Sequence, residues 1–178
     1  AASKNTGRID FGDMPATEKL RPAGHSRIDL AVRWVNKRPD GLYLQSRYGV
    51  LRLSPVGSAI VRVTFNKGMQ LAEETNPNIA VRRIEKSWKY KEMGNIVEMT
   101  TDELCLQVDK ATGAIRYLTR DKNLLLSERS KESRQIESGS GPVNRAWLFL
   151  DWPKGEALYG LGAGDKPGIK LRGTARYI

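Results

Sequence analysis

The chain has 178 residues, of which 39% are hydrophobic, and it carries a formal net charge of +10 at pH 7. This length supports one sizeable hydrophobic core, and no apolar run approaches the roughly 20 residues of a membrane-spanning helix, so we expect one main domain and no membrane span. The cations are spread singly between apolar residues, as in "IVRVTF" and "AIRYL", without a nucleic-acid-binding motif. We therefore expect a solvated sheet face or a surface for an acidic protein, and no nucleic-acid partner.

The first half of the chain changes character at Arg27. Residues 1–26 are polar, contain several glycines and prolines and lack a sustained period, which predicts a loose N-terminal arm. Residues 27–35, "RIDLAVRWV", alternate between apolar and polar side chains, and Pro39-Asp40-Gly41 then supplies a turn. Residues 42–65 predict two or three strands, with breaks near Tyr48-Gly49 and at Pro55-Val56-Gly57.

The second half continues the same pattern up to the C-terminus. Strands are predicted at 81–90, 95–101, 103–109, 114–119, 124–128, 143–152 and 156–162, with a hairpin turn at 110–113 and a polar surface loop at 129–142. Short strands with close spacing and no amphipathic helix predict an all-β fold, an antiparallel β-sandwich spanning 27–178.

The apolar phase of these strands defines the expected core. It comprises Leu104, Leu106, Val108, Ile115, Leu125, Trp147, Phe149, Tyr159 and Leu161, and Ile60 or Val61 together with Val63 and Phe65. Cys105 alternates with the apolar residues of "DELCLQVD", which predicts a partly buried and chemically idle thiol.

Four motifs, in order, resemble the N-terminal β-sandwich of glycoside hydrolase family 31, which contains α-glucosidases and α-xylosidases. The family's Val-Asp-x-x-Thr-Gly strand corresponds to Leu106–Ile115, and its Leu-Leu-x-Glu to Leu125–Glu128. Its aromatic-Gly-Leu-Gly motif corresponds to Tyr159–Gly162, and its Arg-Gly strand to Arg172–Gly173. The residue after Tyr-Gly-Leu-Gly is often Glu or Gln in the family, whereas this chain has Ala163.

The resemblance implies a galactose-mutarotase-like supersandwich that serves as the non-catalytic N-terminal domain of a retaining α-glycosidase. It further implies a catalytic β/α barrel C-terminal to this chain, with the sandwich supporting that barrel and lining the entrance to its oligosaccharide-binding cleft. The expected partner is therefore the barrel of the same polypeptide, with the oligosaccharide substrate reached through the parent enzyme.

The glycine-rich stretch near the C-terminus is the candidate for the cleft or domain-docking loop that the resemblance implies. Its residues are Tyr159, Gly160, Leu161, Gly162, Ala163, Asp165 and Lys166. A purely structural interpretation also stays open, in which the glycines let a strand pass a crowded neighbour while Tyr159 and Leu161 pack inward.

No catalytic residues are predicted within this chain. Glycoside hydrolysis needs two carboxylic groups on opposite sides of the scissile bond, whereas the adjacent pairs Glu73-Glu74 and Asp102-Glu103 are expected to be solvated. A free-standing mutarotase would use histidines, and His25 is the only one. We expect no metal and no cofactor.

A carbohydrate-binding module without a hydrolase partner is the alternative function. It requires exposed aromatic side chains on one face, for which the chain offers Trp34, Tyr43, Tyr48, Trp88 and Tyr90. The compartment stays open: the periplasm or the extracellular space is favoured if a leader has been removed, and the cytoplasm otherwise.

Overall fold

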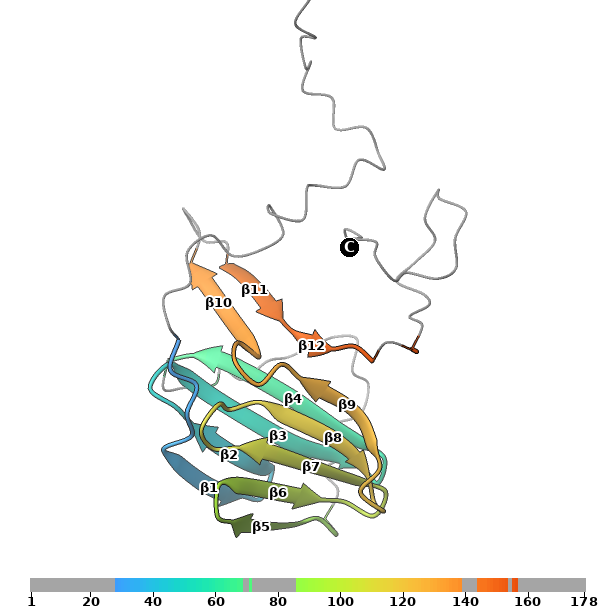
Figure 1. Cartoon of the computed structure of the whole chain (residues 1–178). Helices are drawn as coiled ribbons and strands as arrows, with labels where there is room; N and C mark the ends of the chain where they lie inside the picture. Colours follow the sequence, from blue (N-terminus) through green and yellow to red (C-terminus); the bar gives the residue numbers. More distant parts are fainter. Residues whose placement is uncertain (1–27, 69–70, 72–85, 139–143, 154, 157–178) are drawn as a thin grey trace, which may run out of the picture. The chain divides into compact units, whose positions relative to one another are not determined.

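The computed structural model describes residues 28–68, 71, 86–138, 144–153 and 155–156. Within this part of the chain there are twelve β-strands, all paired antiparallel, and no α-helix (Figure 1). Residues Arg27–Trp152 form one compact unit. None of the described residues forms a helix long and apolar enough to cross a membrane.

Four consecutive strands form the first sheet, in the order β1-β2-β3-β4. They are β1 (Trp34–Arg38), β2 (Gly41–Gln45), β3 (Gly49–Gly57) and β4 (Ile60–Lys67). The turn predicted at Pro39-Asp40-Gly41 joins β1 to β2, and Gly41 has a φ of +147°. A Cβ on Gly41 would overlap the backbone carbonyl of Leu53 on β3, so only glycine fits this close approach.

The second sheet has six strands, in the order β12-β9-β8-β7-β6-β5. They are β5 (Lys89–Met93), β6 (Ile96–Thr100), β7 (Leu104–Asp109), β8 (Ile115–Thr119), β9 (Leu124–Glu128) and β12 (Leu150–Asp151). The predicted hairpin turn between β7 and β8 is present, and Gly113 takes a φ of +70° there. A β-bulge interrupts the pairing of β8 with β9.

A separate two-stranded hairpin consists of β10 (Arg134–Ser138) and β11 (Asn144–Leu148). It corrects the prediction of a surface loop over 129–142, because residues 134–138 of that segment are a strand. The buried positions of β10 carry polar side chains, Arg134 and Gln135. The strand therefore lacks the apolar alternation by which strands are recognised in a sequence.

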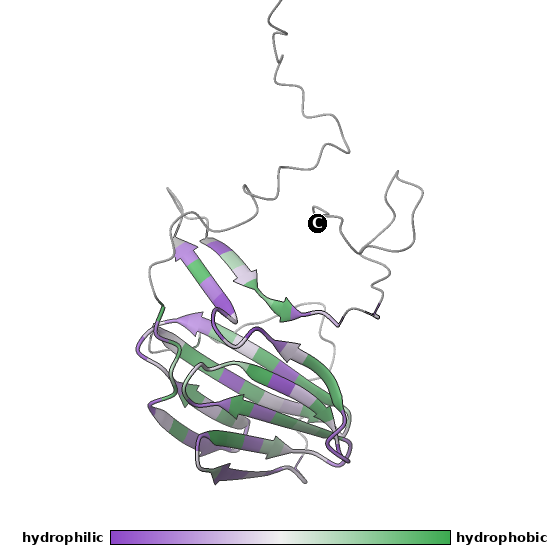
Figure 2. Ribbon diagram, in the orientation of Figure 1, coloured by the Kyte–Doolittle hydropathy of each residue, from purple (hydrophilic) through white to green (hydrophobic). Residues whose placement is uncertain are grey.

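The two larger sheets bury a common hydrophobic core, and Figure 2 shows hydrophobic and hydrophilic residues alternating along their strands. The core residues are Leu42, Leu44, Leu51 and Leu53 from the first sheet, Val97, Met99, Leu106, Val108 and Ile115 from the second, and Trp88 before β5. Alternating side chains from two sheets that meet in one core define a β-sandwich. The predicted all-β, antiparallel sandwich class is confirmed.

The predicted core is correct at its centre and wrong near β9. Leu106, Val108 and Ile115 are buried, and Leu104, Val61, Val63 and Phe65 pack against the core from its margin. Trp147 and Phe149 are only half-buried. Truncating Phe149 to alanine is therefore not expected to cost the several kcal/mol of stability that a central core residue would. Tyr159 and Leu161 lie outside the described residues.

Leu125 is the clearest error in the predicted core, because its side chain is 53% exposed. Tyr117 pairs with Leu126 and Leu118 pairs with Leu124, so Leu125 is the extra residue of the bulge on β9. A bulge leaves its extra residue out of the ladder and breaks the alternation of side chains. A prediction based on period 2 therefore fails at this position.

Candidate functional site

The candidate loop near the C-terminus, with Tyr159, Gly160, Leu161, Gly162, Ala163, Asp165 and Lys166, lies outside the described residues. Its role therefore remains a prediction. His25 and the pair Glu73-Glu74 also lie outside them.

The pair Asp102-Glu103 is described, and both side chains are exposed in the turn between β6 and β7. The Ser87 hydroxyl donates to Asp102 at 3.3 Å, and the Ser58 hydroxyl donates to Glu103 at 2.8 Å. Both carboxyl groups therefore face solvent rather than a desolvated pocket. Within the described part of the chain, no group of His, Cys, Asp and Glu side chains could hold a metal ion.

The five candidate aromatic residues do not form one exposed stacking face. Trp88 is buried in the core, with the Lys37 ammonium 4.8 Å from the centre of its ring. Tyr43 is half-buried and covered by the Arg38 guanidinium at 4.4 Å. Tyr90 on β5 is 36% exposed, and Trp34 on β1 is 64% exposed. The described aromatic residues thus offer less to a sugar ring than the sequence suggests.

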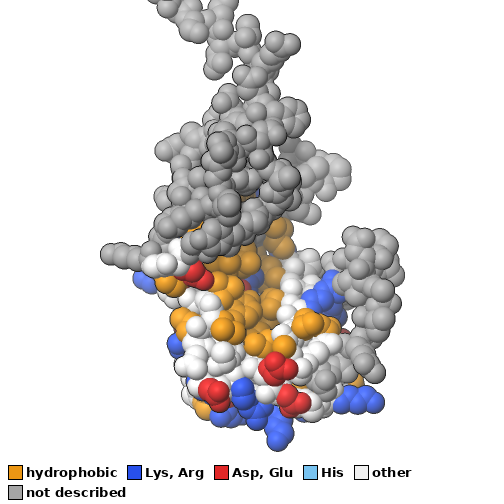
Figure 3. Space-filling view, turned by 90° about the vertical axis from the view of Figure 1, so that its right-hand side faces the viewer, with side chains coloured by type: hydrophobic (Ala, Val, Ile, Leu, Met, Phe, Trp, Pro, Cys, Tyr) orange, Lys and Arg blue, Asp and Glu red, His pale blue; other side chains and the backbone are white. Residues whose placement is uncertain are grey.

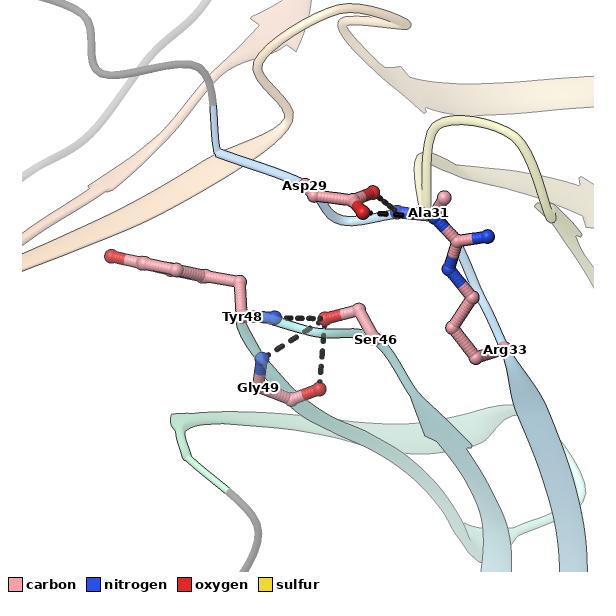
Figure 4. A network of polar contacts seen from close by, with 6 residues as sticks. All are labelled: Asp29, Ala31, Arg33, Ser46, Tyr48 and Gly49. Atoms are coloured by element: carbon pink, nitrogen blue, oxygen red, sulfur yellow. Dashed lines mark hydrogen bonds and ion pairs between the residues drawn. The ribbon is translucent and has the colours of Figure 1, made fainter.

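Tyr48, the fifth candidate, joins the first sheet to the β10–β11 hairpin. The hydroxyl of Ser46 accepts from the backbone N–H groups of Tyr48 and Gly49 at 3.2 and 2.9 Å and shapes the turn between β2 and β3 (Figure 4). The Tyr48 hydroxyl donates to the carbonyl of Ile136 and accepts from the N–H of Ile136 at 3.1 Å. Its ring stacks on Phe65, with 6.0 Å between the centroids. Both the ring and the hydroxyl of Tyr48 are therefore engaged within the protein.

A buried ion pair between Glu128 and Arg134 attaches the same hairpin to the second sheet. Both side chains are almost fully buried, and the guanidinium also donates to the carbonyl of Gly113 at 3.1 Å. The Glu128 carboxylate accepts from the N–H of Ile115 at 3.0 Å and from the hydroxyl of Tyr117 at 3.2 Å. Every oxygen of the carboxylate is thus hydrogen-bonded, as a charge in a dry interior requires.

Burial changes the pKa of Glu128 and that of the neighbouring Tyr117. Burial raises the pKa of Glu128, and this effect outweighs the opposing attraction of Arg134. Burial, followed by the charge of Glu128, also raises the pKa of Tyr117. In the sequence Glu128 stands out only as part of a family motif. Arg134 does not stand out at all, because a lone arginine in a polar segment gives no signal of burial.

A second buried carboxylate, Glu98, lies on the face of the second sheet that points away from the core. Gln107 donates to it at 2.9 Å, and the ammonium groups of Lys91 and Lys122 lie 3.3 and 2.6 Å away. Lys122 also donates to the thiol of Cys105 at 2.9 Å. Cys105 is fully buried, more than the sequence predicts, and burial raises the pKa of its thiol. A buried thiol with a raised pKa is a poor nucleophile.

Glu98 is expected to make the stability of the chain depend on acidic pH. Burial by itself would raise the pKa of Glu98, but the hydrogen bonds from Gln107, Lys122 and Lys91 outweigh it and lower the pKa to about 2. A carboxyl whose pKa is lower in the folded than in the unfolded state stabilises the fold above its unfolded pKa, here 4.5, and loses this contribution as the pH falls toward 2. Urea denaturation between pH 6 and pH 2 should therefore show a steeper loss of stability for the wild type than for Glu98→Gln. Parallel curves of stability against pH for the two proteins would contradict the lowered pKa of Glu98. The other carboxyl groups are the same in both proteins, so their contributions cancel in the comparison.

No protein-family model matches the chain, and no curated protein matches it. Several solved structures share its fold. A family 31 α-xylosidase from a soil metagenome, solved with xylose, matches 80% of this chain with a TM-score of 0.67 and 17% identity. The family 31 α-xylosidase of Xanthomonas citri matches 79% of it with a TM-score of 0.67 and 20% identity. A family 31 dextranase of Flavobacterium johnsoniae, solved with isomaltotriose, matches 84% with a TM-score of 0.69 and 15% identity.

These matches define the class of this protein as a β-sandwich of the kind found in family 31 glycosidases. The resemblance to glycoside hydrolase family 31 drawn from the motifs is confirmed at the level of the fold, while the sequence identities are low. The chain spans only 24%, 16% and 18% of the length of the three enzymes. The shared fold is therefore one part of longer polypeptides in those proteins.

Proposed function

We propose that this chain is the non-catalytic N-terminal β-sandwich domain of a retaining α-glycosidase related to family 31. Its role would be to support a C-terminal catalytic barrel of the same polypeptide and to line the entrance to the substrate cleft. The observation that carries the proposal is the fold match, which covers about four-fifths of this chain and less than a quarter of each α-xylosidase.

The chemistry of the described residues supports a role outside the reaction itself. Glu98 and Glu128 are each enclosed by hydrogen bonds within the protein, and Asp102 and Glu103 are exposed beside serines. A glycosidase needs a positioned acid and a positioned nucleophile or base facing one sugar ring. These four carboxylates do not offer that arrangement, and in this proposal hydrolysis depends on another domain.

The isolated chain is expected to show no hydrolysis of aryl α-glucosides or α-xylosides, even at high protein concentration. The parent polypeptide with its C-terminal region should hydrolyse at least one of these substrates or an α-linked oligosaccharide. Colorimetric release of the aryl group measures both. Turnover by the isolated chain that survives rigorous purification would overturn the non-catalytic role, and an inactive parent without a barrel domain would overturn the assignment to a glycosidase.

The carbohydrate-binding alternative makes a different prediction for the isolated chain. A binding module should be retarded in affinity electrophoresis through a gel that contains a soluble polysaccharide, whereas a supporting domain should migrate unchanged. We expect unchanged migration, because Trp88 is in the core, Tyr48 is engaged with the hairpin and Tyr43 is covered by Arg38.

A further inference from the structure

The turn between β1 and β2 contains the pair Asp40-Gly41, the one place in the sequence where an aspartate or asparagine is followed by glycine. At such a pair the backbone nitrogen of the glycine can attack the side-chain carboxyl of the aspartate, because no Cβ on the second residue obstructs the approach. The product is a five-membered succinimide ring, which water opens to aspartate or to isoaspartate. The pair is therefore a candidate site of spontaneous covalent modification.

The fold itself requires this reactive pair. Gly41 has a φ of +147°, and a Cβ there would overlap the backbone carbonyl of Leu53, so a larger residue would displace β3. The side chain of Asp40, which precedes it, is 43% exposed. Figure 3 shows charged side chains of both signs along the lower part of the domain, which is the part that contains β1 and β5 in Figure 1. The carboxyl of Asp40 is thus accessible to the water that ring opening requires.

Two side chains of the first sheet hold the carboxylate of Asp40 in place. The hydroxyl of Tyr43 donates to it at 2.6 Å, and the guanidinium of Arg52 lies 3.5 Å from the same oxygen. Tyr43 on β2 and Arg52 on β3 are direct partners in the strand register. The guanidinium groups of Arg38 and Arg52 lie 4.4 and 5.8 Å from the centre of the Tyr43 ring. The hydroxyl that holds Asp40 is therefore itself fixed.

We propose that Asp40 is the site at which this chain forms isoaspartate, and that Tyr43 and Arg52 slow the reaction in the folded state. This modification does not depend on the proposed function. Ring closure requires the carboxyl carbon of Asp40 to rotate over the nitrogen of Gly41. The new C–N bond then forms, one C–O bond of the carboxyl breaks, and that oxygen leaves as water with the carboxyl proton and the amide proton. The contacts from Tyr43 and Arg52 oppose the side-chain rotation, and the pairing of Arg38 with Gly41 opposes the backbone rotation that accompanies it.

Isomerisation would change the main chain at the edge of the first sheet. When water cleaves the bond between the ring nitrogen and the backbone carbonyl carbon of Asp40, the main chain continues through Cβ and Cγ and gains one carbon. In a turn closed by the pairing of Arg38 with Gly41, the added carbon disturbs the register of β1, the edge strand. Lys37 on β1 lies 4.8 Å from the centre of the Trp88 ring, so the modification would also loosen one margin of the core.

Incubation of the isolated chain at neutral pH tests the site without any substitution. Mass spectrometry of peptides, with chromatographic separation of the aspartate and isoaspartate forms, measures the rate at Asp40. The folded chain should isomerise at least about tenfold more slowly than the chain in guanidinium chloride, because the reaction requires local opening of the turn. Isoaspartate that forms at other residues of the unfolded chain and not at Asp40 would overturn the assignment of the site. Equal rates in the folded and unfolded chains would overturn the restraint.

A pair of matched variants tests the part played by the tyrosine hydroxyl. Tyr43→Phe keeps the ring and its two guanidinium contacts but removes the hydrogen bond to Asp40, and it should raise the folded-state rate about three- to tenfold, the ratio that one hydrogen bond supports. Tyr90→Phe removes a hydroxyl from β5 of the other sheet and should leave the rate unchanged. A wild-type rate in Tyr43→Phe, or an equal acceleration in Tyr90→Phe, would overturn the proposal that Tyr43 restrains Asp40.

Discussion

Replacing Arg134 with methionine is expected to lower the free energy of unfolding by about 3–5 kcal/mol, the usual cost of removing one partner from a buried ion pair. The substitution leaves Glu128 buried with no opposite charge, although Ile115 and Tyr117 still donate to its carboxylate. It also removes the contact from the guanidinium to the carbonyl of Gly113 and therefore loosens the β10–β11 hairpin. Urea denaturation of the isolated chain at pH 8 measures the loss.

Two comparisons separate the unpaired charge from a general loss of packing. The double variant Glu128→Gln with Arg134→Met should recover a large part of the stability, because it leaves no unpaired charge and the amide oxygen of the glutamine can still accept from the N–H of Ile115 while its NH2 group faces the hydroxyl of Tyr117, which can accept. The destabilisation by Arg134→Met alone should also be smaller at pH 5 than at pH 8. The reason is that burial raises the pKa of Glu128, and a carboxyl with a raised folded pKa costs less as the pH falls and it takes up a proton. A double variant as unstable as Arg134→Met would show that the ion pair is not the cause.

Truncating Leu53 to alanine should cost about 2–5 kcal/mol, the range for a leucine deleted from a packed core. Leu53 lies on β3, is fully buried and belongs to the cluster shared by both sheets. Its neighbours are held by the ladders on either side, so the cavity cannot close completely. The midpoint of urea denaturation should fall while the slope of the transition stays unchanged.

Leu125 offers a matched control for Leu53, since the same substitution is made where the side chain is 53% exposed. Leu125→Ala should change the stability of the isolated chain by no more than about 0.5 kcal/mol. A large loss at Leu125 together with a small loss at Leu53 would contradict the described core and support the core predicted from alternation alone.

Most of the fold is predictable from local patterns. Apolar and polar residues alternate over β2, β3, β7 and β8, and their turns carry residues with suitable backbone preferences, such as Gly41 and Gly113. Such patterns reflect interactions between near neighbours in the chain, which a sequence displays directly. The family motifs add the resemblance to family 31, and the fold shared with the family 31 enzymes agrees with that prediction.

The buried polar side chains and the exposure of Leu125 are less predictable. Arg134 is a single arginine in a polar segment, and nothing around it in the sequence distinguishes it from the exposed Arg129. Glu98 meets Lys122 across the second sheet, and this contact depends on how β6, β7 and the turn after β8 are aligned. The glycine-rich loop at Tyr159–Lys166 remains a candidate on sequence grounds alone.

The sequence by itself determined the all-β class, the positions of most strands and the resemblance to family 31, because these depend on the period of apolar residues and on turn chemistry. Only the tertiary structure decided which polar side chains are buried in pairs, as Glu128 is with Arg134, and that Leu125 is exposed. The physical reason is that burial depends on the number of strands in each facing sheet and on the register between strands. A single inserted residue, such as the bulge on β9, changes which side chains face the core without leaving a local signal.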